Sequence, residues 1–336
     1  MKLLHPAFFC ARRPPAMAAL LALAFLPTAA APAAATEASA RGAGSSLRQA
    51  DIRIASIAFR IAVAGKALCP RLTPLSGIAF HHLAEYRPAD RAGMIADHGL
   101  DRGPGVLGVV AGSPADRAGL IAGDVLLAVN DAPFPRPVLP GRRAKAKTWR
   151  PLTEAAEDQL EGALAKGAAE LKVLRAGREL RLRLDPAPAC PGRVRLAYSK
   201  QVNAFATDHK VVMTDSMLRF LRNDDELAIV LGHEMAHRIL GHPPTRNEDG
   251  LLAAFGIKAG ELWRREAEAD RLGLRLAASA GYDLGAAIPF WRRYLGKYDW
   301  FPQLFRSHPS LKARERIVRA EIEAIGRERG AERTAP

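Results

Sequence analysis

Two histidines four residues apart constrain the fold of this 336-residue chain more than any other feature. His233 and His237 lie in a largely apolar run from 227 to 240. Residues 223–226 read Asn-Asp-Asp-Glu and supply a helix N-cap with an acidic first turn, and Gly241 ends the run. The pattern predicts a helix. Because residues four apart lie on one face of a helix, both imidazoles can bind the same metal ion.

Glu234 follows the first of these histidines directly. Its carboxylate lies beside the face that carries His233 and His237, so it can take a proton from a water molecule at the metal without being a ligand itself. The three residues form the pattern H-E-x-x-H. A chance match occurs in roughly one or two sequences per hundred of this composition, so the motif alone suggests a metal site without proving one.

A catalytic zinc with two histidine ligands needs a third protein ligand and an open position for water. The segment 264–271 contains three acidic residues. Glu266 and Asp270 share a helix face, whereas Glu268 is rotated by about 200° and is expected to point to solvent. We predict Glu266 as the third ligand of one Zn²⁺ per chain, and Asp270 as the acceptor for the free ring nitrogen of a ligating histidine. The alternative is an ordinary charged helix face paired with neighbouring arginines.

The first 35 residues have the composition of a secretory signal. Basic residues precede an apolar run from 17 to 26, and small residues follow up to Ala35. We predict cleavage near Ala35 and a periplasmic location. The apolar run is too short to cross a bilayer, so we expect no integral membrane segment after cleavage, with peripheral membrane contact left open.

The charge and the cysteines narrow the class of protein further. A formal net charge of +14 would suit binding to nucleic acid or anionic lipid, but no segment interleaves arginine with aromatics as a base-stacking surface does, so we predict no nucleic-acid partner.

Without the leader, two cysteines remain, Cys69 and Cys190. An even count in an oxidising compartment favours a disulfide, and two unrelated thiols are the alternative.

Residues 105–131 predict a strand, a glycine turn, a short helix, a second turn and another strand. This segment resembles bacterial PDZ domains. The resemblance implies a groove that binds an extended peptide as an added strand and a loop that captures a C-terminal carboxylate. By analogy the loop falls near 77–80, and the opposite wall is a helix that carries Leu160 and Leu164.

Residues 196–320 resemble the gluzincin metallopeptidases, which include HtpX, the CAAX prenyl proteases and soluble periplasmic relatives. The resemblance rests on several segments that occur in the family's order. It implies zinc, peptide-bond hydrolysis, and an edge strand for the substrate at Asn203, Ala204 and Phe205. The chain lacks the membrane helices of HtpX and the prenyl proteases. The matching segments are 202–205, 209–213, 225–228, 233–237, 266–270, 280–283 and 307–310.

The same resemblance points to His308 and Arg314 as catalytic residues. His308 would occupy the fourth zinc position in a resting form, donate a hydrogen bond to the oxyanion, or satisfy a hydrogen bond in the core. Arg314 would stabilise the oxyanion or only hold its helix. For both residues these alternatives stay open at this point.

Together these features predict an α+β protein: a PDZ-like, β-rich domain followed by a mainly helical gluzincin domain with a small edge-strand sheet. The expected function is a zinc endopeptidase for unfolded or misassembled exported proteins, with the PDZ-like domain assisting substrate binding. The alternative is a PDZ-guided chaperone or adaptor with a dispensable metal site. The predicted segments are a signal peptide (1–35), a flexible lead-in and amphipathic helix (36–70), the PDZ-like domain (71–186), a linker (187–195), the peptidase domain (196–325) and a polar tail (326–336).

Overall fold

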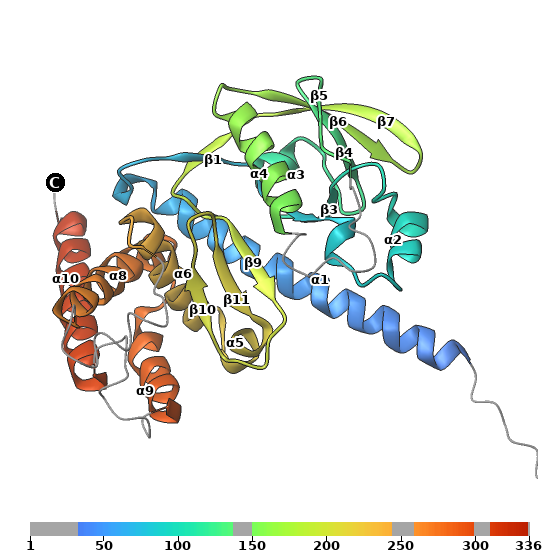
Figure 1. Ribbon diagram of the computed structural model, residues 1–336. Helices are drawn as coiled ribbons and strands as arrows, with labels where there is room; N and C mark the ends of the chain where they lie inside the picture. The colour runs from blue at the N-terminus through green and yellow to red at the C-terminus, as the bar shows by residue number, and fades with distance from the viewer. Residues whose placement is uncertain (1–32, 137–149, 244–258, 299–309, 335–336) are drawn as a thin grey trace, which may run out of the picture. The chain divides into compact units, whose positions relative to one another are not determined.

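The computed structural model describes residues 33–136, 150–243, 259–298 and 310–334 (Figure 1). The chain forms two units, Met1–Ala43 and Gly44–Pro336, and the hydrophobic cores and sheets of the described residues lie in the second. Most of the predicted signal peptide and His308 lie outside the described residues. Among the helices that are described, none has both the length and the apolar character needed to span a membrane.

The first helix, α1, runs from Ala33 to Ala64, so the prediction of a flexible lead-in was wrong. Its N-terminal half is rich in alanine, the residue that favours a helix most, and this outweighs the interspersed glycine and serine. Ile54, Ile57 and Ile61 are 1%, 3% and 0% exposed. They join a hydrophobic core that extends through the helices near the C-terminus. The amphipathic helix is therefore part of that core.

A six-stranded antiparallel sheet forms the β-rich region, residues 73–189, in the order β2-β3-β4-β6-β7 with β5 paired to β4. The hairpin β6–β7 turns at Ala176 and Gly177, which both have positive φ. The elements of the sheet and of the helices around it are β2 (Ile78–His81), η2 (Leu83–Glu85), α2 (Arg91–His98), β3 (Gly105–Val109), α3 (Pro114–Arg117), β4 (Val125–Val129), β5 (Ala132–Pro133), α4 (Arg150–Leu164), β6 (Ala169–Arg175) and β7 (Arg178–Leu184).

The ends of the β-rich region are joined to each other. After the short turn η1 (Lys66–Leu68), strand β1 (Thr73–Leu75) pairs antiparallel with β8 (Ala187–Ala189). A disulfide links Cys69 to Cys190, with the two Cα atoms 5.7 Å apart. The prediction of a linker at 187–195 was therefore wrong, since these residues contain β8 and the start of β9. Pro188 is tolerated in β8 because both strands of a two-stranded sheet are edge strands.

The helical region, residues 194–334, combines a three-stranded sheet with five α-helices in the parts that the structure describes. The strand order is β10-β11-β9, with β10 antiparallel and β9 parallel to β11. Helix α6 begins at the predicted cap, where the Asn223 side chain accepts a hydrogen bond from the amide of Glu226. The elements are β9 (Val194–Ala197), β10 (Ala204–Ala206), β11 (Val211–Thr214), α5 (Asp215–Phe220), α6 (Asp224–Ile239), α8 (Ala259–Ser279), η4 (Leu284–Ala286), α9 (Ala287–Tyr298) and α10 (Leu311–Thr334).

Helix α10 continues to Thr334, so the polar tail predicted from residue 326 is helical instead. Its arginine, glutamate and alanine residues are good helix formers. The helix is also tied to α8, because Arg275 donates two hydrogen bonds to Glu328 at 2.8 and 3.0 Å. The antiparallel sheet and the helices lie mostly in different parts of the chain, which confirms the predicted α+β fold class.

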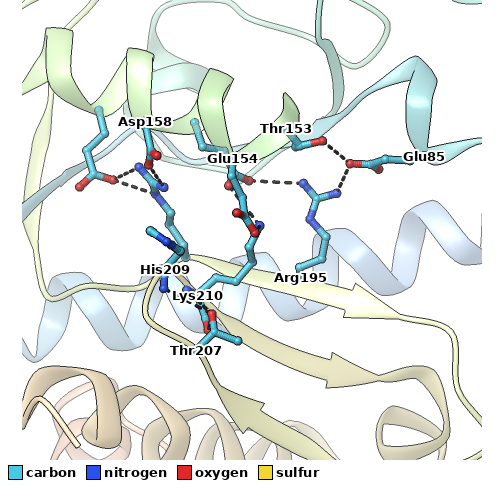
Figure 2. Close-up of polar contacts among 11 residues, drawn as sticks. Glu85, Thr153, Glu154, Asp158, Arg195, Thr207, His209 and Lys210 are labelled. Carbon is cyan, nitrogen blue, oxygen red and sulfur yellow. Dashed lines mark hydrogen bonds and ion pairs between the residues drawn. The ribbon is translucent and has the colours of Figure 1, made fainter. Parts of the chain in front are cut away.

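Charged side chains connect the two regions (Figure 2). Arg195 on β9 donates to Glu85 of η2 at 2.8 Å. Lys210, just before β11, lies 3.0 Å from Glu154 of α4. Arg193 donates to Glu161 of α4 at 2.8 Å. Helix α4 therefore turns an acidic side toward basic residues of the small sheet, a partnership that the sequence did not predict.

Candidate active site

Helix α6 carries His233, Glu234 and His237, and its two histidines lie about one turn apart. The two Nε2 atoms of the histidines lie 3.1 Å apart. Glu266 of α8 reaches the same point, with Oε2 3.6 Å from Nε2 of His233 and Oε1 3.4 Å from Nε2 of His237. The structure thus brings together the three residues predicted as ligands, with one potential ligand atom from each within 4.8 Å of the others.

This donor set fits zinc. Two nitrogens that bind one zinc at 2.0–2.1 Å with tetrahedral geometry lie about 3.3 Å apart, close to the observed separation of the imidazoles. Two histidines and one carboxylate are a ligand set of catalytic zinc sites, in which the fourth position takes water or substrate. His233 and Glu266 are each 4% exposed, whereas Glu234 is only partly buried. The arrangement could therefore hold an ion, and Glu234, the residue after His233, is less buried than the two ligand candidates next to it.

Two glycines let the helices that carry these residues approach closely. A Cβ on Gly232 would lie 2.6 Å from the carbonyl oxygen of Gly273, and one on Gly273 would lie 2.7 Å from the amide nitrogen of His233. Helices α6 and α8 therefore meet backbone to backbone next to His233. Sequence reasoning missed this pair. The available signal was one glycine in the interior of each helix, where glycine is costly unless packing requires it.

Asp270 and Arg314 contact His233 and Glu266 on the buried side of the site. Oδ1 of Asp270 lies 2.9 Å from Nδ1 of His233, where an orienting acceptor was predicted. Arg314, 1% exposed, donates from Nε to Asp270 and from Nη2 to Glu266, both at 2.8 Å. Its guanidinium therefore contacts the carboxylate predicted to bind the metal and the carboxylate predicted to orient a ligand.

Trp291 of α9 completes this layer and was not anticipated. The guanidinium carbon of Arg314 lies 3.8 Å from the centre of its ring, and the His233 ring packs edge-on at 5.6 Å. The tryptophan thus contacts both a cation and an imidazole of the site. An aromatic residue at this position could not be told from a core residue in the sequence.

The carboxylates make the pocket attractive to positive charge. Burial lowers the pKa of His233, but hydrogen bonds and charge from Asp270 and Glu266 outweigh it and raise that pKa to about 10. Burial raises the pKa of Asp270, but the charge of Arg314 and the hydrogen bond with His233 bring it below its usual value. A proton or a metal cation is therefore stabilised at this point.

His242 and Glu268 lie on the other side of the site. Nδ1 of His242 is 2.9 Å from Nδ1 of His237, and its Nε2 is 3.2 Å from Oε2 of Glu268. The prediction that Glu268 points to solvent was incomplete: its side chain is 41% exposed but pairs with a histidine. The helical wheel placed Glu268 correctly away from Glu266, but could not show that the chain after α6 covers that face.

The predicted substrate strand lies at the edge of the small sheet. Ala204 and Phe205 belong to β10, which pairs with β11, and among the described strands nothing pairs with its other side. Asn203 precedes it and its amide donates to the Thr214 hydroxyl at 3.1 Å. Phe205 is 38% exposed. The strand also packs near α6, so an edge capable of pairing with a peptide lies close to the helix that carries the histidines.

The β-rich region contains a cavity of about 100 Å³. Its lining includes Ile78 to Phe80 of β2 and Leu160 and Leu164 of α4, the two segments that the resemblance to PDZ domains named as sides of the groove. Residues 78–80, predicted as part of a carboxylate-binding loop, are a strand instead, and the turn before them is at Gly77, with φ of 79°. The cavity is also lined by α1.

Comparison with known proteins agrees with this geometry. Residues 185–262 and 262–322 match peptidase family M48, and residues 105–138 match the PDZ domain family. The segment 185–322 is thus similar to peptidase family M48. M48 peptidases are metal-dependent hydrolases of peptide bonds, and the convergence of imidazole and carboxylate at one point is compatible with such a site.

Three proteins that are similar to part of this chain are metalloendopeptidases named OMA1. The mitochondrial OMA1 of Arabidopsis thaliana is 30% identical over 140 residues, which are 35% of this chain and 29% of that protein. The OMA1 of Danio rerio is 27% identical over 166 residues, 38% of this chain and 35% of that protein. The OMA1 of Schizosaccharomyces pombe is 29% identical over 137 residues, 32% of this chain and 40% of that protein. The chain thus spans about a third of the length of these relatives.

Among solved structures, the PDZ domain of HtrA3 bound to a phage-derived ligand is similar to this chain, with 21% identity and a TM-score of 0.25. The match covers 34% of this chain and 87% of that one. The PDZ character of the β-rich region therefore rests on the family match at residues 105–138.

Proposed function

We propose that this chain is a zinc-dependent endopeptidase that hydrolyses unfolded or misassembled exported proteins. The observation that supports this most is the convergence of His233, His237 and Glu266 beside Glu234 within an M48 domain. The family match supports a metallopeptidase. The choice of zinc rests on the donor set of two imidazoles and one carboxylate.

His233, His237 and Glu266 would hold one Zn²⁺ per chain, which when bound polarises the scissile carbonyl and acidifies the attacking water. Glu234 would take the proton from that water and return it to the leaving amine. Asp270 would keep the proton of His233 on Nδ1, so that Nε2 is free to bind the metal. Arg314 would hold Glu266 and Asp270 in place, which its two hydrogen bonds support better than contact with substrate.

The substrate would lie along β10. An extended peptide can add to an exposed strand edge by backbone hydrogen bonds, whatever its side chains, which suits a protease that acts on many unfolded chains. The exposed Phe205 would contribute an apolar contact. The geometry thus favours recognition of extended backbone over recognition of one folded partner.

The decisive variant is Glu234→Gln, which removes the base but keeps the shape of the side chain. We expect it to bind one zinc per chain and to lose cleavage of an unfolded protein by at least about a hundredfold. Glu261→Gln, on the outer side of α8 where Glu261 pairs with Arg265, is the matched control and should cleave normally. If Glu234→Gln cleaves like wild type, the proposed mechanism is wrong. Full biological function without cleavage would favour the adaptor alternative.

The PDZ-like domain would assist by binding apolar segments of long substrates. Ile78 lines the groove, whereas Ile121 is 49% exposed in the same region and does not line it. We expect Ile78→Arg to weaken cleavage of unfolded proteins while sparing short peptides, and Ile121→Arg to change neither. Equal loss on both substrates with Ile78→Arg would indicate a structural role.

We also propose export to the periplasm. The disulfide between Cys69 and Cys190 supports an oxidising compartment, and the predicted signal at 1–35 would direct the chain there. Fractionation followed by mass determination of the N-terminus tests this proposal. Recovery of the chain in the cytoplasm with free thiols would contradict it.

A further inference from the structure

His242 contacts the site without belonging to the group of three ligands. Its Nδ1 lies 2.9 Å from Nδ1 of His237, the ring nitrogen that does not face Glu266 and His233. Its Nε2 lies 3.2 Å from Glu268 of α8. The side chain is 9% exposed. His242 therefore sits behind His237, in the position that Asp270 holds behind His233.

The backbone builds this contact. Helix α6 ends beside Gly241, whose φ of 68° is in the left-handed region that glycine adopts at helix ends. The amide of His242 then donates to the carbonyl of His237 at 2.9 Å. The chain thus turns back on the last turn of α6 and sets the His242 ring edge-on against the ring of His237, with the ring centres 5.1 Å apart.

The hydrogen bonds agree with only one pair of tautomers when Nε2 of His237 binds a metal. His237 must then carry its proton on Nδ1 and donate it to Nδ1 of His242. His242 must in turn carry its proton on Nε2 and donate it to the carboxylate of Glu268. Every donor in this series of hydrogen bonds faces an acceptor, and the series ends on an ion that can only accept.

We propose that His242, backed by Glu268, is a positioning residue that sets the ring orientation and tautomer of His237 for metal binding. This inference rests on the proposed zinc site. The two histidine ligands are then oriented differently: His233 directly by a buried carboxylate, His237 through an intervening imidazole to a carboxylate that is 41% exposed.

The test compares two substitutions at His242. In His242→Asn the side-chain oxygen replaces Nδ1 as acceptor, whereas His242→Phe keeps a ring and removes the acceptor. Zinc affinity is measured by competition with a chelator, and the geometry of the site by the visible spectrum of the Co²⁺-substituted protein. We expect His242→Phe to weaken zinc binding by roughly 10- to 100-fold and to alter the Co²⁺ spectrum, as loss of an orienting partner does. His242→Asn should lie between it and wild type.

Substitutions at Glu268 provide the second arm and a control. Glu268→Ala should weaken zinc binding in the same direction by a smaller factor, and Glu261→Gln on the same helix should leave affinity and spectrum unchanged. If His242→Phe does not fold, as judged by thermal unfolding of the metal-free protein, His242→Asn and Glu268→Ala carry the test. Wild-type affinity and spectrum in the folded variants would overturn the positioning role. A wild-type protein that binds no zinc would overturn the proposed function as well.

Discussion

Two clusters of charged side chains are buried to different degrees in this chain. At the candidate metal site, the side chains of Arg314, Glu266 and Asp270 are 1%, 6% and 2% exposed. Between the β-rich region and the small sheet, the side chains of Arg195 on β9 and Glu85 of η2 are 17% and 18% exposed. Both clusters pair arginine with carboxylates, but the first has almost no access to water.

The comparison shows that residue type alone does not assign a role. In the first cluster an arginine pairs with two carboxylates, and one of them, Glu266, also faces two imidazoles, so the group could hold a metal ion. In the second cluster Arg195 pairs with carboxylates of another region, and the described residues form no group of three potential metal ligands there. Deep burial makes the loss of one partner costly, whereas partial exposure lets water replace it.

The largest effect is expected when Arg314 is replaced by methionine. Two carboxylates would then stay buried without their cation, which should lower the free energy of unfolding by about 3–5 kcal/mol. Urea denaturation in the presence of a chelator measures this value. A loss below about 1 kcal/mol would remove the distinction between the two clusters.

Removing the disulfide should come next. The bridge closes a separation of 121 residues that includes the whole β-rich region. Because it restricts the unfolded chain, replacing Cys69 and Cys190 by serine should lower stability by about 2–4 kcal/mol. Zinc affinity should remain as in wild type, since neither cysteine contacts the ligands. A large drop in zinc affinity would show that the two regions are coupled through α1.

A smaller change is expected from the contact between the two helices of the metal site. Gly273→Ala adds a Cβ 2.7 Å from the amide nitrogen of His233, so α6 and α8 must separate. Stability should fall by about 1–3 kcal/mol, and zinc affinity should fall with it. Gly162→Ala on α4, where a Cβ would meet nothing within 4 Å, is the control and should be neutral or stabilising. Unchanged zinc affinity in Gly273→Ala would mean that the ligands tolerate a wider helix spacing.

The smallest effect is expected at the second cluster. Arg195→Met should cost about 1–2 kcal/mol, between the values for exposed and for buried pairs. Arg219, 68% exposed in its pair with Asp215, serves as control, and Arg219→Met should cost less than about 0.5 kcal/mol. High salt should reduce the stability of wild type more than that of Arg195→Met. A loss for Arg195→Met as large as for Arg314→Met would contradict the comparison.

The helix α6 and the two histidines could be predicted because their signals are local. A cap at Asn223, an acidic first turn and a spacing of four residues depend only on helix geometry. The neighbours of Glu268 could not be read in the same way. Its partner His242 lies outside α8, and only the turn at Gly241 brings the two together.

By itself, the sequence determined which residue types repeat at helical spacing and that Glu266 and Asp270 share one helix face. It also carried the resemblance to metallopeptidases. Tertiary structure alone decided that Gly232 and Gly273 touch, that α1 belongs to the core, and that an acidic side of α4 meets basic residues of the small sheet. The physical reason is distance along the chain. Positions four apart are related by backbone dihedrals, whereas contacts between helices depend on how separate segments pack.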